Sequence, residues 1–468
     1  MNILEETRPV LNDTDIARLR ALVGESNVSV RQADLEAHSI DESWLDPHAP
    51  DVVVWPGSTE EVSAVVRYAN DRGLPVVPWS GGSSLEGNPV PVRGGILLAM
   101  YRMKRVLEIR EEDLLVVVQP GIVYDELNAA LRHLGLFFPP APGSADVATI
   151  GGMVANNSSG MRAVKYGVTR DYVQKATVVL PNGEVVELGS LAKKTTSGYD
   201  LLSLFVGSEG TLGVATEITL RVTGLPATVG VVVASFDELD GATNSVYETV
   251  RFGLTPSAVE ILDTETVRVT NEQQGLSLAV KPTLFVEFHG TEVSVEEQIG
   301  FLREICEDNA CASFEDALSA EECERLWKAR KEAHDSIKFS NAGKVMVSGD
   351  VSVPISRFAE MIPFVHDVGR RVGLKIYAFG HAGDGNMHTE TIASREVPGE
   401  LERAHEATAA IVRRALELGG TVAGEHGIGV AKREFLAEEH GPSLELMRSI
   451  KRLFDPKGIM NPGKIFAD

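Results

Sequence analysis

The sequence predicts an α+β protein of two or three domains. Its 468 residues are enough for several hydrophobic cores, and 43% of them are hydrophobic, which is ordinary for a soluble globular chain. Short apolar strands alternate with amphipathic helices through the first half. The alternation resumes after Thr223-Gly-Leu-Pro226, a turn-forming segment that marks a boundary.

Three helices are expected in the first half. The first spans 12–23, where Asn12 or the next residue can cap its start and apolar residues recur at helical spacing. Ser58-Thr-Glu-Glu61 is a capping signal for a second helix, which ends near Arg72. The third spans 123–134.

Strands are expected around these helices, from short apolar runs bounded by turn residues. They lie at 52–55, 74–79, 95–100, 106–110, 114–119, 173–180 and 185–188. The last two flank Pro181-Asn-Gly183, which is typical of a hairpin turn. The first half is therefore expected to mix strands and helices.

The second region repeats the alternation of strand and helix. Strands are expected at 229–236 and 284–289, and helices at 238–252 and 295–309. This pattern predicts an α/β sandwich with an antiparallel sheet. From Glu400 onwards the chain is expected to be mainly helical.

Charge, cysteine content and hydropathy limit the classes of function. Acidic residues (67) exceed basic ones (44) by 23, which argues against nucleic acid and anionic membrane surfaces as partners. The start, Met1-Asn-Ile-Leu-Glu-Glu6, lacks the basic and apolar parts of a secretory signal, and no apolar run approaches the length of a membrane span. The three cysteines, Cys306, Cys311 and Cys323, fit a reducing cytoplasm. We expect a cytoplasmic protein, with peripheral membrane attachment left open.

Two glycine-rich motifs near the C-terminus contain three histidines and carboxylates. They are Tyr377-Ala-Phe-Gly-His-Ala-Gly-Asp-Gly-Asn-Met-His-Thr-Glu390 and Gly424-Glu-His-Gly-Ile-Gly429. Imidazoles with a carboxylate are ligands that suit Zn²⁺ and related divalent metals.

The first of these motifs predicts a hairpin with strands at 375–381 and 387–392. If Ala382 pairs with Met387, then His381 lies directly opposite His388, with Cβ atoms roughly 4.5–5.5 Å apart. Two imidazoles at that distance can share one metal. The alternative is that one histidine caps the turn and the other is a surface residue.

Four loops of small residues in the first half suggest a large ligand. They are Pro78-Trp-Ser-Gly-Gly-Ser-Ser-Leu-Glu-Gly87, Pro140-Ala-Pro-Gly-Ser144 with Thr149-Ile-Gly-Gly152, Asn156-Asn-Ser-Ser-Gly160 with Tyr166-Gly167, and Gly207-Ser-Glu-Gly-Thr-Leu-Gly213. Glycines let backbone N–H groups approach a phosphate closely. Neither a Walker A loop nor a G-x-G-x-x-G fingerprint is present, and a domain that is simply rich in turns is the alternative.

These loops resemble the FAD-binding domain of the vanillyl-alcohol oxidase / p-cresol methylhydroxylase superfamily. Gly380–His388, Gly424–Gly429 and Met460-Asn-Pro-Gly-Lys464 resemble motifs of its branch of GlcD-type glycolate oxidases and D-lactate dehydrogenases (cytochrome), and the likeness runs from about Asp46 to the end. The resemblance implies a two-subdomain FAD-binding domain of the p-cresol methylhydroxylase type plus an α/β substrate (cap) domain with an antiparallel sheet. The expected domains are 1–224 for FAD (core about 46–224), 225–410 for substrate, and 411–468 as a C-terminal helical segment returning to the flavin site.

The resemblance also implies which residues hold FAD: the first loop at the pyrophosphate, the second and third at the flavin and ribityl, the fourth at the adenine side. These residues are Trp79, Ser80, Gly81, Gly82, Ser83, Ser84, Gly87, Asn88, Pro142, Gly143, Ser144, Thr149, Gly152, Asn156, Ser158, Ser159, Gly160, Tyr166, Glu209, Gly213 and Ile218, with Asn461 reaching the isoalloxazine. Some members of the superfamily attach FAD through a His or Cys in the first loop. Residues 79–88 contain neither, so the FAD is expected to be non-covalent.

The chemistry of the substrate site follows from the same likeness. Leu326-Trp-Lys-Ala-Arg-Lys331 resembles the branch's Trp-x-x-Arg motif, which makes Arg330 the expected ligand of the substrate carboxylate; a solvated helix charge is the alternative. His381, His388 and Glu425 are expected to hold a divalent metal, Zn²⁺ or Mn²⁺, and His426 to be the general base, with hydride passing to flavin N5.

The expected function is oxidation of a D-2-hydroxy acid to the 2-oxo acid by an FAD-dependent dehydrogenase. Val347-Ser-Gly-Asp-Val-Ser-Val-Pro354 departs from the Tyr-Lys-Tyr-Asp form of D-2-hydroxyglutarate dehydrogenases, with Ser348 in place of the Lys, which favours a monocarboxylate such as D-lactate. A glycolate oxidase flavin subunit and a D-2-hydroxyglutarate dehydrogenase are the alternatives within the class. Outside it, a metal-dependent hydrolase and a non-catalytic FAD subunit remain.

The electron acceptor is expected to be external, because the sequence has no haem or cluster motif. Quinone, a cytochrome, an electron-transfer flavoprotein and an iron–sulfur subunit all fit, and a homodimer is left open.

Overall fold

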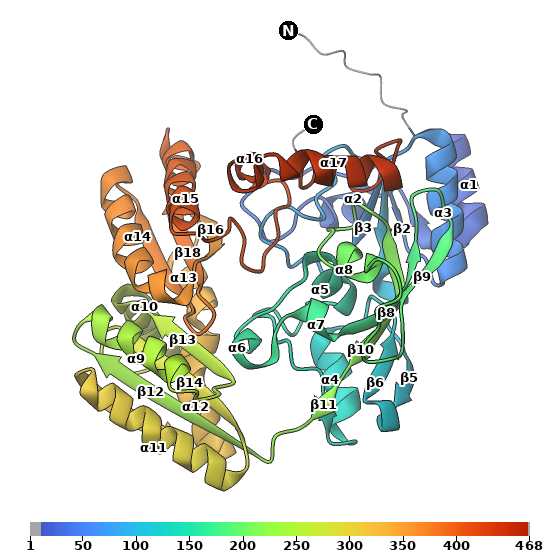
Figure 1. The fold of residues 1–468 in the computed structure, drawn as a ribbon. Coiled ribbons are helices and arrows are strands. Elements are labelled where there is room, and N and C mark those ends of the chain that lie inside the picture. Colours follow the sequence, from blue (N-terminus) through green and yellow to red (C-terminus); the bar gives the residue numbers. More distant parts are fainter. Residues whose placement is uncertain (1–10, 467–468) are drawn as a thin grey trace. The chain divides into compact units, whose positions relative to one another are not determined.

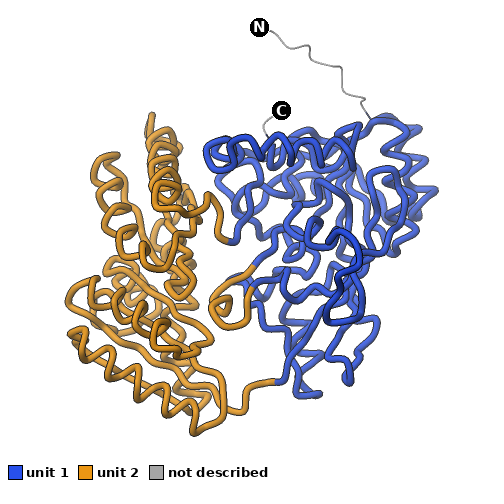
Figure 2. The backbone as a smooth tube through the Cα atoms, in the orientation of Figure 1, with its two compact units in different colours: residues 1–158, 168–224, 425–468 blue, residues 159–167, 225–424 orange. Residues whose placement is uncertain are grey.

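The computed structural model describes residues 11–466 and divides the chain into two compact units. Unit 1 contains residues up to 158, 168–224 and the segment from 425 onwards, and unit 2 contains residues 159–167 and 225–424 (Figure 2). The first six residues, on which the expected absence of a secretory signal rests, lie outside the described residues. None of the described helices combines the length and the apolarity that crossing a membrane requires.

Unit 1 is built on two sheets (Figure 1). In its described part a four-stranded sheet has the order β1-β2-β4-β3, with β2, β4 and β3 parallel, and a five-stranded antiparallel sheet has the order β5-β6-β10-β8-β9, beside a short β11-β7 pair. The strands are β1 Val28–Ser29, β2 Val52–Val54, β3 Val76–Trp79, β4 Ile96–Ala99, β5 Val106–Arg110, β6 Leu115–Val118, β7 Leu136–Phe137, β8 Val173–Val179, β9 Val185–Gly189, β10 Val214–Arg221 and β11 Thr223–Gly224.

The helices of unit 1 begin where the capping signals predict. Asn12 caps the first with a capping box, and Ser58 caps the third by accepting from the backbone of Glu61. The helices are α1 Asp13–Val23, α2 Gln32–Ala37, α3 Thr59–Arg72, α4 Tyr124–Arg132, α5 Ile150–Asn156, α7 Thr169–Tyr172, α8 Leu201–Phe205, α16 Leu436–His440 and α17 Ser443–Phe454. Helices α1 and α3 pack on the four-stranded sheet to form one apolar core of the unit.

Unit 2 is a single sheet with helices on both sides. Its described strands are all antiparallel, in the order β15-β12-β14-β13-β17-β18-β16. They are β12 Thr228–Phe236, β13 Ala258–Leu262, β14 Thr283–Gly290, β15 Cys311–Ala317, β16 Val345–Ser352, β17 Lys375–His381 and β18 Asn386–Ala393. The expected antiparallel α/β sandwich is confirmed.

The helices of unit 2 form two layers. Helices α10, α12 and α13 contact one another and contribute to an apolar core with the central strands, while α9, α11, α14 and α15 form the other layer. The helices are α6 Ala163–Tyr166, α9 Leu239–Arg251, α10 Thr264–Gln274, α11 Glu292–Asp308, α12 Ala320–Lys331, α13 Ala333–Ser340, α14 Phe358–Val372 and α15 Glu400–Glu417. Residues 283–289 of β14 are all buried, as expected for a strand covered on both faces.

The C-terminal part differs from a continuous helical segment. Helix α15 packs on β16 and β18 and so belongs to unit 2. Residues 418–432, rich in glycine, form no helix. Gly429 has a φ of +51°, and a Cβ there would lie 2.1 Å from the backbone oxygen of Glu86, so the sequence after α15 is suited to close packing rather than to a helix.

The last described residues are joined to the four-stranded sheet. The backbone of Val76 accepts from Asn461 and donates to Ile459, each at 2.8 Å, which adds a parallel bridge beside β3. The Lys464 ammonium donates to the backbone oxygen of Val90. A segment far along the sequence thereby becomes part of the first sheet.

A buried ion pair attaches the segment before α16 to the first glycine loop of the same unit. Lys432 Nζ lies 2.9 Å from Glu86 Oε1, and the two side chains are 1% and 2% exposed. A charge buried this deeply is stable only when it is paired.

We predict that Lys432→Met lowers the free energy of unfolding of the FAD-bound protein by about 3–5 kcal/mol, because it leaves the Glu86 charge buried without its cation. Chemical denaturation followed by fluorescence measures the change. Arg452→Met is the control, since the Arg452–Glu445 pair is exposed and its loss should shift the midpoint far less. Equal midpoints for the two variants would contradict the prediction.

Candidate functional site

The histidine hairpin forms with a register different from the expected one. His381 pairs with Asn386, and His388 pairs with Phe379, so the expected pairing of Ala382 with Met387 is wrong by two residues. The turn begins one residue earlier because Gly385, with a φ of +84°, closes it by donating its N–H to the backbone oxygen of His381 at 3.1 Å.

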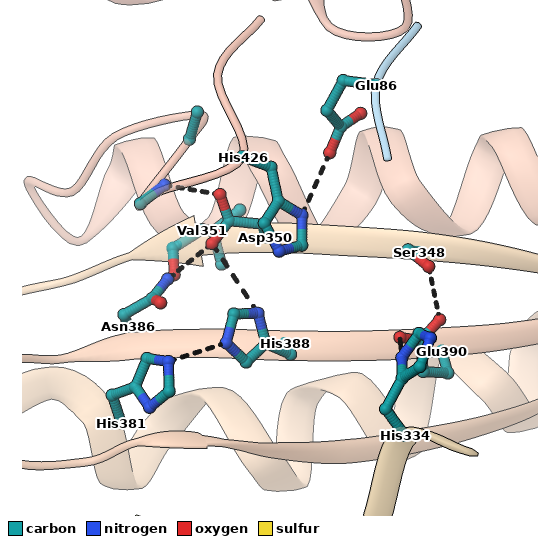
Figure 3. A network of polar contacts seen from close by, with 12 residues as sticks. Glu86, His334, Ser348, Asp350, Val351, His381, Asn386, His388, Glu390 and His426 are labelled. Atoms are coloured by element: carbon teal, nitrogen blue, oxygen red, sulfur yellow. Dashed lines mark hydrogen bonds and ion pairs between the residues drawn. The ribbon is translucent and has the colours of Figure 1, made fainter. Parts of the chain in front are cut away.

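The two imidazoles nevertheless meet. A shift of two residues keeps each side chain on its face of the sheet, whereas a shift of one would have reversed it. His381 Nε2 and His388 Nε2 lie 3.2 Å apart, with ring planes at 86° to each other (Figure 3). Both side chains are buried.

A buried carboxylate, Glu260, joins His381 to Arg330. Its Oε1 lies 2.6 Å from His381 Nδ1, and its Oε2 accepts from Arg330 Nε at 2.6 Å. Burial raises the pKa of this carboxyl, but Arg330 and His381 outweigh burial and hold the pKa below its ordinary value. Because an ionised carboxylate only accepts, Nδ1 of His381 is the donor of this bond, and in a neutral ring the lone pair is then on Nε2, toward His388.

A second carboxylate, Asp350, stands behind His388. The two residues are directly paired between β16 and β18, and Asp350 Oδ1 lies 3.8 Å from His388 Nδ1. Asp350 also accepts from the side-chain amide of Asn386 at 2.6 Å and from the backbone N–H of Gly424 at 2.8 Å. Glu425 follows Gly424 in the sequence, so its Cα lies about 3.8 Å from the Cα of a residue that Asp350 binds.

These residues fit a divalent metal. Two nitrogens bound to one tetrahedral zinc at about 2.0–2.1 Å lie roughly 3.3 Å apart, which matches the 3.2 Å between the imidazoles. A carboxylate on the far nitrogen of a ligating histidine is the usual support of such sites. The distance also suits a hydrogen bond between the rings, so the metal content of the protein decides between the two.

A further polar cluster lies on the same face of the hairpin. The Ser348 hydroxyl donates to Glu390 Oε2 at 2.7 Å, and His334 Nδ1 lies 3.0 Å from Glu390 Oε1 (Figure 3). Burial lowers the pKa of His334, but the hydrogen bond to Glu390 and the negative charges of Glu390 and Asp335 together outweigh burial and raise the pKa. Glu390 follows His388 by two residues, which places its carboxylate roughly 7 Å further along the strand.

Three carboxylates of this region, Glu260, Asp350 and Glu390, were not among the expected site residues. A signal was present, because each carboxylate interrupts a segment that forms a buried strand, and Glu260 stands between Val259 and Ile261. Carboxylates are almost never fully buried unless they are paired.

The first glycine loop of unit 1 has the properties of an anion site. Residues 80–85 are half-buried, and the backbone N–H groups of Gly81, Gly82 and Ser83 donate to no backbone oxygen among the described residues. A Cβ on Gly81 would lie 2.4 Å from the backbone oxygen of Val147, so the second loop packs directly against the first. Successive unengaged N–H groups suit a phosphate.

The second and third loops continue this surface. Thr149 caps α5, the helix that carries Gly152 and Asn156, and its hydroxyl contacts Ser80 of the first loop. Pro142, Gly143 and Ser144 precede α5 and Ser158 follows it, all in unit 1. Among the described residues, the side-chain oxygen of Asn88 is buried and accepts no hydrogen bond, which suits a ligand that donates one.

Glu209 and Asn461 brace the loops to one another. Glu209 accepts from the Asn88 amide at 2.8 Å and from the backbone N–H groups of Ile428 and Gly429 at 2.7 and 2.9 Å. The Asn461 amide donates to the backbone oxygens of Asn88 and Glu209. Gly213 immediately precedes β10, and Ile218 is fully buried in an apolar core, in a strand paired with β6 on one side and β8 on the other.

Three residues expected in the FAD-binding domain lie in unit 2. Ser159, Gly160 and Tyr166 belong to the segment 159–167, which packs on β14. The segment is held by polar contacts: Arg162 to Glu287 at 3.1 Å, Lys165 to the backbone oxygen of His289 at 2.7 Å, and the Tyr166 hydroxyl to His289 Nδ1 at 2.8 Å.

The expected base, His426, is fixed in unit 1. Its backbone oxygen accepts from the amides of Asn156 and Asn88, at 3.0 and 3.4 Å. Its Nδ1 lies 3.5 Å from Glu86 Oε1 (Figure 3). The imidazole is 16% exposed and is therefore accessible to a ligand.

Comparison with known proteins covers almost the whole chain. The family model described as FAD linked oxidases, C-terminal domain, matches residues 225–465, and the model described as FAD binding domain matches residues 50–189.

Similar proteins of known name carry out related oxidations. A probable mitochondrial D-lactate dehydrogenase of Danio rerio is 40% identical over 456 residues, 96% of this chain and 91% of the relative. The glycolate oxidase subunit GlcD of Bacillus subtilis (strain 168) is 36% identical over 447 residues, 95% of each chain. The mitochondrial D-lactate dehydrogenase (cytochrome) of Arabidopsis thaliana is 42% identical over 420 residues, 89% of this chain and 73% of the relative.

Solved structures confirm the fold class. p-Cresol methylhydroxylase with substrate bound superposes with a TM-score of 0.82 at 18% identity, over 97% of each chain. Alkyldihydroxyacetonephosphate synthase superposes with a TM-score of 0.77 at 20% identity, over 98% of this chain and 87% of the other.

Proposed function

The chain belongs to the family of FAD-linked oxidases, and on this premise we propose that it is an FAD-dependent dehydrogenase that oxidises a D-2-hydroxy acid, with D-lactate favoured, to the 2-oxo acid. One observation of the molecule carries the proposal. Glu260 joins an arginine suited to a carboxylate to a pair of imidazoles suited to a metal, within hydrogen-bonding distance of both.

FAD, when bound, supplies the acceptor for the hydride. We propose that the loop 79–88 holds its pyrophosphate through unengaged N–H groups, and that the loops around α5 hold the flavin and ribityl. Gly213 and Ile218 would serve the adenine side. Glu209 and Asn461 act by holding the loops in place, since their side chains already bind neighbouring backbone groups.

We propose His381, His388 and Glu425 as the metal ligands. A divalent metal there would lower the pKa of the substrate hydroxyl, as it does for bound water. Glu260 and Asp350 orient the two imidazoles.

Arg330 binds the substrate carboxylate in this proposal. It is 7% exposed, and Glu260 engages only its Nε, so the planar Nη groups remain for a second carboxylate. A guanidinium matches such an anion with two parallel hydrogen bonds, which an ammonium does not.

His426 is the proposed general base. Its ring has the intrinsic pKa range that suits proton transfer near neutral pH. Two asparagine amides bind its backbone oxygen and so hold the backbone from which the imidazole extends.

The Glu390 cluster favours a substrate with one carboxylate. The buried Glu390 carboxylate, which contacts Ser348 and His334, lies on the same face of the hairpin as His388 and would disfavour a second carboxylate on the substrate. Glycolate and D-lactate avoid this charge, and the similarity to GlcD keeps glycolate as the alternative substrate.

An anaerobic reduction screen tests the proposal. We expect D-lactate to bleach the flavin absorbance faster than L-lactate or D-2-hydroxyglutarate, with glycolate as the measured alternative. A purified protein without flavin absorbance would indicate the metal-dependent hydrolase instead. Flavin that no 2-hydroxy acid reduces would indicate a non-catalytic FAD subunit.

The second expectation is that the FAD is non-covalent, because the loop 79–88 has no His or Cys to attach it. Acid precipitation should release the flavin into the supernatant. Yellow colour retained in the washed pellet would contradict this.

The third expectation separates ligand from base. His388→Ala should remove the metal and the activity but keep FAD, because the glycine loops lie in the other unit. His426→Ala should keep metal and FAD while slowing turnover by roughly 10²–10⁴-fold, as for loss of a general base. Elemental analysis and flavin spectra of both variants decide, and the reverse pattern of metal loss would show that ligand and base are exchanged.

A further inference from the structure

The Glu260 carboxylate contacts two residues with different proposed roles, His381 as a metal ligand and Arg330 as the ligand of the substrate carboxylate. Glu260 lies in β13 directly opposite His381, and its side chain is 0% exposed. One carboxylate oxygen engages the imidazole of His381 and the other engages the guanidinium of Arg330, each at 2.6 Å.

We propose that Glu260 is a positioning residue that orients the metal ligand His381 and the carboxylate-binding Arg330 together, so that affinity for metal and affinity for substrate depend on one buried anion. This inference rests on the proposed function and deepens it. In it Glu260 acts through His381 and Arg330 and does not itself bind the metal or the substrate.

The two bonds require a carboxylate. Each oxygen of an ionised carboxylate accepts, whereas an amide offers one accepting oxygen and an NH₂ group that only donates. In Glu260→Gln, the guanidinium and the Nδ1–H of His381 compete for one oxygen. The cation makes the stronger bond and takes it.

The consequence falls on the metal ligand. Nδ1 of His381 would then lie beside the amide NH₂, which only donates, so a hydrogen bond between them requires Nδ1 to accept. Its hydrogen moves to Nε2, and a protonated Nε2 offers no lone pair to a metal. The isosteric change therefore acts on the tautomer of His381 rather than on the shape of the core.

Unit 2 provides a matched control in the same sheet. Glu287 of β14 is also buried, 6% exposed, and also links an arginine to a histidine, with Arg162 at 3.1 Å and His289 Nε2 at 2.9 Å. Neither of these partners is a proposed metal ligand. Both partners lie on the same oxygen of Glu287, Oε1, so Glu287→Gln can keep their shared acceptor and tests only for the effect of a buried amide in the same sheet.

The experiment measures metal affinity of the FAD-bound protein by dialysis against chelator-buffered Zn²⁺ and Mn²⁺, with metal and flavin quantified together. We expect Glu260→Gln to bind metal about 10–100-fold more weakly than wild type and to raise KM for D-lactate, with FAD retained. Glu287→Gln should keep the wild-type metal affinity. The double variant Glu260→Gln with Arg330→Met should recover metal affinity, because the amide oxygen is then available to His381, while KM stays raised.

The double variant also covers the case in which Glu260→Gln alone does not fold, since it leaves no buried guanidinium competing for the amide. Wild-type metal affinity in Glu260→Gln, an equal loss in Glu287→Gln, or no recovery in the double variant would each overturn the inference. A wild-type protein that binds no metal would overturn the proposed metal site and the inference with it.

Discussion

The burial of the Glu260 carboxylate constrains the whole of unit 2. A charge without solvent is tolerated only when cations or strong donors surround it, and here the donors come from α12 and β17, far apart in the sequence. The strand order that places β13 beside β17 is therefore also what brings Glu260 and His381 together. Any packing that separated these elements would leave the carboxylate unpaired, so the proposed site and the stability of the sheet depend on the same contacts.

Unit 1 also contains buried carboxylates, and its C-terminal segment supplies their partners. Glu86 is paired with Lys432, and Glu209 binds the backbone of residues 428 and 429. Both carboxylates stand in glycine-rich loops that would otherwise be suited to anions. Their contacts with the segment that carries His426 hold that segment in unit 1. A segment that follows unit 2 in the sequence is in this way required to complete unit 1.

The sequence was most informative where structure is local. The capped starts of α1 and α3, the strands of the histidine hairpin and the boundary after β11 follow from spacing, capping residues and turn residues alone. The register of the hairpin depends on a contact that is not local. Gly385 closes the turn against the backbone of Val353, the residue after β16, and a Cβ on Gly385 would lie 2.0 Å from the Val353 oxygen. The alternation of faces has a period of two, which is why the imidazoles meet although the register differs.

The amino-acid sequence by itself determined the class of fold, the glycine loops suited to FAD and the pair of histidines suited to a metal, because each depends on residue types at short spacing. Tertiary structure decided which carboxylates support them. Glu260, Asp350 and Glu390 are recognisable only once strands distant in sequence lie side by side, since a carboxylate within an apolar strand has no partner in its own segment. Tertiary packing also decided that Tyr166 belongs to unit 2, where Arg162 pairs with Glu287 and the Tyr166 hydroxyl contacts His289, although the segment lies next to the FAD loops in the sequence.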